Sequence, residues 1–137
     1  MVDERHPRGL IDTSVVIGLE TTPADHLPAE VAVSAVTMAE LAAGPHATND
    51  SEERARRQDR LQRVEASFDP LPFDAGSARA YGRIYSAVVS AGRKARGARA
   101  VDLLIAATAL GAELPLYTRN PDDFRSLEGL LTVVPVR

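Results

Sequence analysis

The sequence has no cysteine, no tryptophan and only one lysine, Lys94, among its 137 residues. The lack of cysteine excludes disulfides, thiolate metal sites and cysteine nucleophiles, and it fits a reducing cytoplasm. No apolar run reaches the roughly 18–20 residues that a membrane-spanning helix needs, so we expect no membrane association. Three Phe and three Tyr are too few to make base stacking the main mode of nucleic-acid recognition.

What the sequence does contain is typical of one globular domain. Apolar residues make up 45% and charged residues 26% of the chain, and the length suits a single domain over residues 1–137. The net charge of −3 argues against a protein that coats nucleic acid non-specifically. Most cations are arginines, and two stretches, residues 54–63 and 93–99, are rich in them.

Short β-type runs alternate with helical runs along the chain. The predicted strands are residues 9–11, 31–34, 71–73, 114–118 and 131–136, and the predicted helices are residues 15–20, 35–43, 50–68, 75–91, 101–110 and 121–127. This alternation predicts an α/β fold with a mostly parallel sheet and helices on both faces. Pro72 places the third strand at an edge, and Ser34 and Asp74 are expected to cap the helices that follow them.

In a parallel sheet, functional groups collect beyond the carboxyl ends of the strands. Four acidic positions fall in such places: Asp12, Glu40, Asp102 and the segment 118–123. Each also has a plainer interpretation, since Asp12 and Asp102 could be helix caps and Glu40 a solvated helix residue. Asp122 could be a first-turn acid favoured by the helix dipole.

The neighbours of two of these acids weaken the plainer interpretations. Glu40 lies in the nearly apolar run 36–43, and Asp102 lies in the run 100–107. A buried carboxylate must be paired or bind a metal. Because no lysine or histidine cluster lies nearby in the sequence, a cation from solution is the natural partner. Mg²⁺ prefers oxygen ligands, and carboxylate-bound metals support phosphodiester hydrolysis.

Four segments in this order resemble the PIN domain, and most closely the VapC-type toxin ribonucleases of bacterial toxin–antitoxin pairs. The segments are residues 11–17, 34–41, 102–109 and 116–124. The resemblance covers essentially the whole chain. It implies a three-layer α/β/α fold with a five-stranded sheet. It also implies an endoribonuclease that depends on Mg²⁺ or Mn²⁺ and cuts a structured or single-stranded RNA loop of the tRNA or rRNA class.

The resemblance also assigns site residues. The catalytic, metal-binding acids map onto Asp12, Glu40, Asp102 and Asp122. The fourth position stays open between Asp122, Asn120 and Asp123. Side chains that would support the metal ligands are Thr13, Thr118 and Asn120.

An acidic site that binds RNA needs cations around it. The candidates are Arg93, Lys94, Arg96 and Arg99, which precede Asp102, and Arg119. The plainer interpretation of the 93–99 stretch is a solvated loop. Acidic residues interleave with the arginines of residues 54–63, so ion pairing along a solvated helix is expected there.

The family usually forms homodimers, and a VapB-type antitoxin neutralises the toxin in a hetero-oligomeric complex. A groove beside residues 36–41 and 50–68 could accept the antitoxin peptide. One alternative is a catalytically inactive PIN fold that only binds RNA or protein. The other is a phospho-acceptor receiver domain, which needs a lysine after its last strand, and Lys94 does not lie there.

Overall fold

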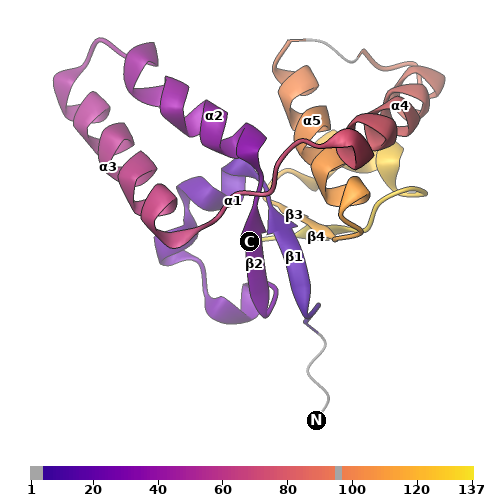
Figure 1. Cartoon of the computed structure of the whole chain (residues 1–137), viewed down its shortest axis with the longest axis horizontal. Coiled ribbons are helices and arrows are strands. Elements are labelled where there is room, and N and C mark those ends of the chain that lie inside the picture. Colours follow the sequence, from indigo (N-terminus) through magenta and orange to yellow (C-terminus); the bar gives the residue numbers. More distant parts are fainter. Residues whose placement is uncertain (1–4, 95–96) are drawn as a thin grey trace.

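The computed structural model describes residues 5–94 and 97–137 and is built around a parallel sheet (Figure 1). The sheet order is β2-β1-β3-β4, and every neighbouring pair is parallel. The strands are β1 (Arg8–Ile11), β2 (Glu30–Val33), β3 (Leu116–Thr118) and β4 (Val133–Pro135). All their carboxyl ends therefore lie at one edge of the sheet.

Helices cover both faces of this sheet. The α-helices are α1 (Thr13–Ile17), α2 (Ala35–Ala43), α3 (Ser51–Ser67), α4 (Ala75–Ser90) and α5 (Ala98–Gly111). Short 3₁₀ helices are η1 (Leu19–Thr21), η2 (Ala24–His26), η3 (Gly44–Ala47) and η4 (Pro121–Leu127). The paired helices α2 and α3 lie on one side of the sheet, and α4 and α5 lie on the other (Figure 1). The three-layer α/β/α prediction is confirmed.

Alternation along the strands divides the core between the two faces. Leu10 and Leu116 are buried with the apolar residues of α4, α5 and η4. Their neighbours Ile11 and Tyr117 face the other way, against α1, α2 and α3. Successive strand side chains point to opposite faces, so each strand contributes residues to both cores. This packing fixes the positions of the helix layers relative to the strand ends.

The sheet has four strands in the described part of the chain, so the prediction of five was wrong. The predicted strand at residues 71–73 is reduced to a single parallel bridge between Leu71 and Ser34. The Leu71 N–H donates to Val33 O at 2.9 Å, and Leu71 O accepts from the Ala35 N–H at 2.7 Å. The ladder stops there because the partner segment enters α2 at Ala35. The segment nonetheless adds beside β2, the edge strand, as predicted.

Helix boundaries follow the local chemistry of the chain. Ser34 accepts from the Thr37 N–H and caps α2, and Asp74 accepts from the Ser77 N–H and caps α4, as predicted. The helix expected to begin at residue 101 begins at Ala98. No helix in the described residues is both long and apolar enough to cross a membrane.

Two residues on α4 and α5 show how the outer surface and the packing of these helices differ. Tyr85 on α4 is 49% exposed. Gly111 ends α5 against the start of α4, where an added Cβ would lie 2.9 Å from the backbone nitrogen of Ser77. The two helices can approach this closely because residue 111 has no side chain.

Candidate active site at the carboxyl ends of the strands

The order of the sheet places its switch point at β1. The chain passes from β1 to β2 on one side and later returns to β3 on the other. Open α/β sheets bind their ligands outside the carboxyl ends of the strands at such a point. Asp12 follows β1 there, and its N–H donates to Tyr117 O at 3.0 Å.

Asp12 is buried and firmly oriented. Its Oδ1 accepts from the Ser14 hydroxyl at 2.5 Å and from the Val15 N–H at 3.2 Å. The Ser14 hydroxyl in turn accepts from the Arg119 N–H at 3.1 Å, which ties the start of α1 to the end of β3. Asp12 therefore is the cap of α1, as the plainer interpretation held. Within the described residues, these hydrogen bonds reach only Oδ1, so Oδ2 stays available to a ligand.

Glu40 lies on α2 and is held by a chain of hydroxyls. The Thr13 hydroxyl donates to Glu40 Oε1 at 2.5 Å and lies 3.0 Å from the Thr37 hydroxyl. Ser34 Oγ lies 3.3 Å from the same Thr37 oxygen. The half-buried Glu40 is thus joined to α1 by hydrogen bonds that fix its carboxylate near the start of that helix.

Asp102 lies in the second turn of α5 and is not a helix cap. Burial, followed by the nearby carboxylates of Glu40, Asp12 and Asp123, raises the pKa of Asp102 from 3.8 to about 6, and Arg99 opposes this shift. Loss of water and like charges both disfavour the ionised carboxylate. The carboxylates of Glu40, Asp12 and Asp123 therefore lie near enough to Asp102 to act on its charge.

The acid that reaches Asp102 from η4 is Asp123. The carboxylate of Asp122, the first choice from sequence, is 82% exposed and pairs with Arg125 at 2.5 Å. It lies in the first turn of η4, as the dipole interpretation expected. Asn120 precedes η4, is exposed, and makes no side-chain cap; its N–H donates to the buried Thr118 hydroxyl at 3.0 Å.

The carboxylates are near one another without forming a closed cage. Within residues 5–94 and 97–137, no three Asp, Glu or His side chains are packed as a ready-made metal site. Like charges without a cation keep apart. Mg²⁺ keeps several waters and binds through one or two carboxylates, so the donor chemistry of Asp12 and Asp102, supported by Glu40 and Asp123, fits such an ion.

The predicted RNA-binding cations fall into different environments. Arg93 and Lys94 are exposed before α5, and Arg96 lies outside the described residues. Arg99 is half-buried and donates to Asp123 O at 2.9 Å. The Arg119 guanidinium donates to the Thr22 hydroxyl at 2.5 Å and covers Gly18.

Three comparisons with known proteins agree on the family of this chain. The family model of the PIN domain matches residues 9–130. Ribonuclease VapC5 of Mycobacterium tuberculosis is 37% identical over 132 residues, covering 94% of each chain. Ribonuclease VapC of Rickettsia bellii is 31% identical over 134 residues, covering 93% of this chain and 97% of the relative.

The chain belongs to the PIN domain family.

The solved structures place this PIN domain beside the VapC proteins. The crystal structure of VapBC-5 from Mycobacterium tuberculosis, a member of the VapBC family of toxin–antitoxin systems, has a chain that matches with a TM-score of 0.81 and 36% identity. The match covers 96% of this PIN domain and 98% of that chain. The family sets aside the receiver-domain alternative.

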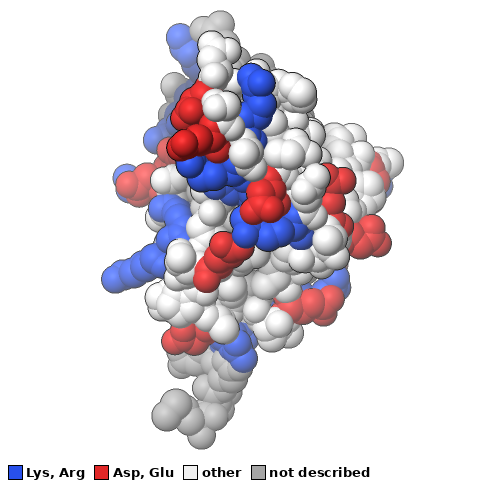
Figure 2. All heavy atoms as spheres, turned by 90° about the vertical axis from the view of Figure 1, so that its left-hand side faces the viewer, with Lys and Arg blue, Asp and Glu red and all other residues white. Residues whose placement is uncertain are grey.

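Other charged and hollow surfaces of this PIN domain lie apart from the carboxylates. On α3, Glu53 pairs with Arg56 and Arg57, and Arg63 pairs with Glu20 and Asp59. This confirms the expected ion pairing, and Figure 2 shows the two signs of charge interleaved on that side of the molecule.

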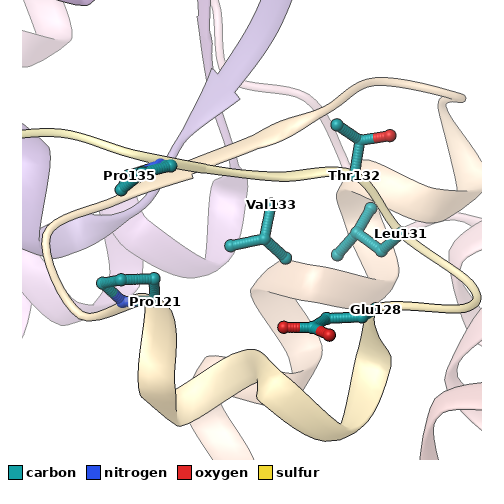
Figure 3. Close-up of a pocket in the computed structure, with 6 residues that line it drawn as sticks. All are labelled: Pro121, Glu128, Leu131, Thr132, Val133 and Pro135. Carbon is teal, nitrogen blue, oxygen red and sulfur yellow. The ribbon is translucent and has the colours of Figure 1, made fainter.

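A pocket of about 450 Å³ lies between η4 and β4 (Figure 3). Its lining is mainly apolar side chains with one carboxylate: Pro121, Glu128, Leu131, Thr132, Val133 and Pro135. None of the clustered acids lines it, so it is not the candidate active site.

Sequence reasoning did not identify two residues that shape the site of this PIN domain. Ser14 holds Asp12, and Thr37 joins the hydroxyls that hold Glu40. Their positions carry a signal that could have found them. Ser14 stands two residues after Asp12, where a hydroxyl can bond back to the carboxylate. Thr37 stands three residues before Glu40, on the same face of α2.

Proposed function

We propose that this PIN domain is the metal-dependent endoribonuclease toxin of a VapBC-type toxin–antitoxin pair. The observation that carries the proposal is the convergence of Asp12, Glu40 and Asp123 on Asp102, whose pKa rises to about 6. Strongly perturbed carboxyls at a strand-end cluster are typical of catalytic sites. The relatives named Ribonuclease VapC support RNA as the substrate class.

The metal proposal assigns Mg²⁺, or Mn²⁺ in its place, to oxygens of Asp12 and Asp102. When bound, the cation would supply Lewis-acid polarisation of the phosphate and a more acidic water. Glu40 would accept a proton or a water hydrogen bond beside the ion. Its orientation is supported by the 2.5 Å bond from Thr13, and Asp12 is oriented by Ser14.

The fourth acidic position goes to Asp123 in this proposal. Asp123 is half-buried and acts on Asp102, whereas Asp122 is exposed and paired with Arg125. Asn120 and Thr118 support the turn that brings η4 to the cluster, because the Thr118 hydroxyl accepts from the Asn120 N–H.

The RNA proposal rests on the exposed cations near the acids. Arg93 and Lys94 are exposed beside the start of α5 and would contact the phosphate backbone. Arg119 already bonds to Thr22 and would contribute its charge from a fixed place. The chain has only three Phe and three Tyr. Recognition of the RNA would therefore rest on the shape of a tRNA or rRNA loop more than on stacking of its bases.

The partner proposal is a VapB-type antitoxin, and it is supported by the VapBC-5 complex. We propose that an antitoxin segment lies along α2 and α3 and places a cation among the acids. The test compares the affinity of an arginine-containing antitoxin peptide for wild type and for the double variant Asp12→Asn, Asp102→Asn. Equal affinities would refute the proposal that a cation of the antitoxin lies among the acids. We also propose a homodimer, which sedimentation equilibrium would test.

The activity is tested with purified, antitoxin-free protein and total cellular RNA in Mg²⁺, Mn²⁺ or EDTA. Discrete fragments should form only with a divalent cation and should disappear in Asp12→Ala. A matched control is Asp25→Ala, on the exposed η2, which should cut as wild type does. Intact RNA in every metal condition would instead favour the alternative of a PIN fold that binds without cleaving.

A further inference from the structure

Arg99 occupies an unusual place among the cations near the cluster. It lies in the first turn of α5, three residues before Asp102, so both side chains share one face of the helix. Its Nη1 donates to the main-chain oxygen of Asp123 at 2.9 Å, across 24 positions of sequence. The side chain is half-buried, which sets it apart from the exposed Arg93 and Lys94.

The segment that Arg99 reaches is the turn that leads into η4. Asn120 gives η4 no side-chain cap, but the Asn120 N–H donates to the Thr118 hydroxyl at 3.0 Å. The buried ring of Phe124 anchors the next residue of η4 in the core. Arg93 also reaches this turn, through Asp122 O, at the longer distance of 3.4 Å. Of these two arginine bonds, the one from Arg99 is the shorter, and it comes from α5 itself.

The acceptor that Arg99 uses matters for the site. Within the part of the chain that the structure describes, Arg99 is in no ion pair with a carboxylate. It places its positive charge beside the acids and lowers the pKa of Asp102, against the effect of the three neighbouring carboxylates. Because the Arg99 guanidinium bonds to a main-chain carbonyl, it does not itself occupy the carboxylate oxygens of Asp102 and Asp123, which another cation could use.

We propose that Arg99 is a positioning residue. By donating to the main-chain oxygen of Asp123, it holds Asp123 beside Asp102 and thereby supports the binding of a divalent cation. This inference rests on the proposed metal-dependent function. It separates Arg99 from the RNA-contacting cations, among which the sequence placed it. Residues that orient metal ligands contribute about 10–100-fold to metal affinity.

The test measures Mn²⁺ binding by titration calorimetry and electron paramagnetic resonance, without RNA. Arg99→Met should weaken Mn²⁺ binding by about 10–100-fold, and Arg99→Lys should retain more affinity because an ammonium can donate to the same carbonyl. The control Arg83→Met removes the same charge from an exposed position on α4 and should bind Mn²⁺ as wild type does. Circular dichroism establishes that each variant is folded.

A double-mutant cycle tests whether Arg99 acts on Mn²⁺ binding through Asp123. In an Asp123→Asn background, Arg99→Met should cause little further loss, because the two residues act as one unit. Unchanged Mn²⁺ affinity in Arg99→Met, with a raised KM for RNA, would overturn the inference and make Arg99 an RNA contact. Failure of the proposed function looks different, since wild type itself would then bind no Mn²⁺.

Discussion

Replacing Asp102 by asparagine should make the metal-free protein more stable above pH 6. The ionised carboxylate is disfavoured in the folded state by burial and by its acidic neighbours, so its pKa rises from 3.8 to about 6. Between these values the folded protein holds a proton that the unfolded chain has released. Stability therefore falls as the pH rises through this window, and the full penalty is present above it.

The size of the effect follows from the pKa. A rise of about two units corresponds to about 3 kcal/mol at 1.36 kcal/mol per unit. Because the carboxyl is only half-buried, water screens part of this, and about 1–2 kcal/mol is expected. For a chain of this length, that free energy corresponds to an increase in Tm of about 3–10 °C.

The assay is thermal unfolding in EDTA at pH 4 and pH 7.5. Asp102→Asn should unfold at a higher temperature than wild type at pH 7.5, and the two should converge at pH 4. Asp122→Asn makes the same chemical change on a side chain that is 82% exposed, so its Tm should stay within about 2 °C of wild type. An Asp102→Asn protein that is less stable than wild type at pH 7.5, or equally stabilised at both pH values, would refute this reasoning.

Three further substitutions, two of them with a matched control, test other parts of the account. Gly111→Ala should lower the free energy of unfolding by about 1–3 kcal/mol in urea titration, because its Cβ would meet the α4 backbone at 2.9 Å. Gly82→Ala, which has open space around its Cβ, should raise it by about 0.5–1 kcal/mol. Thr37→Val should cost about 0.5–1.5 kcal/mol, since it removes the buried hydroxyl that bonds to the hydroxyls of Thr13 and Ser34. Asp123→Asn should lower the rate of RNA cleavage by about tenfold or more, and Asp122→Asn should lower it less; the reverse order would contradict the assignment.

Much of the fold could be predicted because its local signals agree with its packing. The helix predicted at residues 50–68 forms as α3 over Ser51–Ser67, capped by Asp50, with Val64 buried. Alternating strands and helices gave the parallel sheet and three layers. At residues 71–73, the apolar pattern predicted a strand, but the partner segment enters α2 at Ala35, so the ladder is limited to one bridge.

The site was harder to predict from the sequence, because the orientation of η4 decides which of its acidic side chains reaches Asp102. Asp122 and Asp123 are adjacent, and their side chains leave η4 in different directions: one is exposed beside Arg125, and the other acts on Asp102. A sequence pattern does not fix that rotation, which the burial of Phe124 and the bond from Arg99 help to set. The bond from the Arg119 N–H to the Ser14 hydroxyl likewise forms only when β3 lies beside β1.

The central claim is that one divalent cation site lies among these carboxylates. The most direct measurement is the anomalous scattering of Mn²⁺ in crystals of the antitoxin-free protein. The account predicts a Mn²⁺ peak within roughly 2.0–2.3 Å of carboxylate oxygens of Asp12 and Asp102, with Glu40 and Asp123 around it. A peak at Asp122 instead, or no peak at Mn²⁺ concentrations that support RNA cleavage, would contradict it.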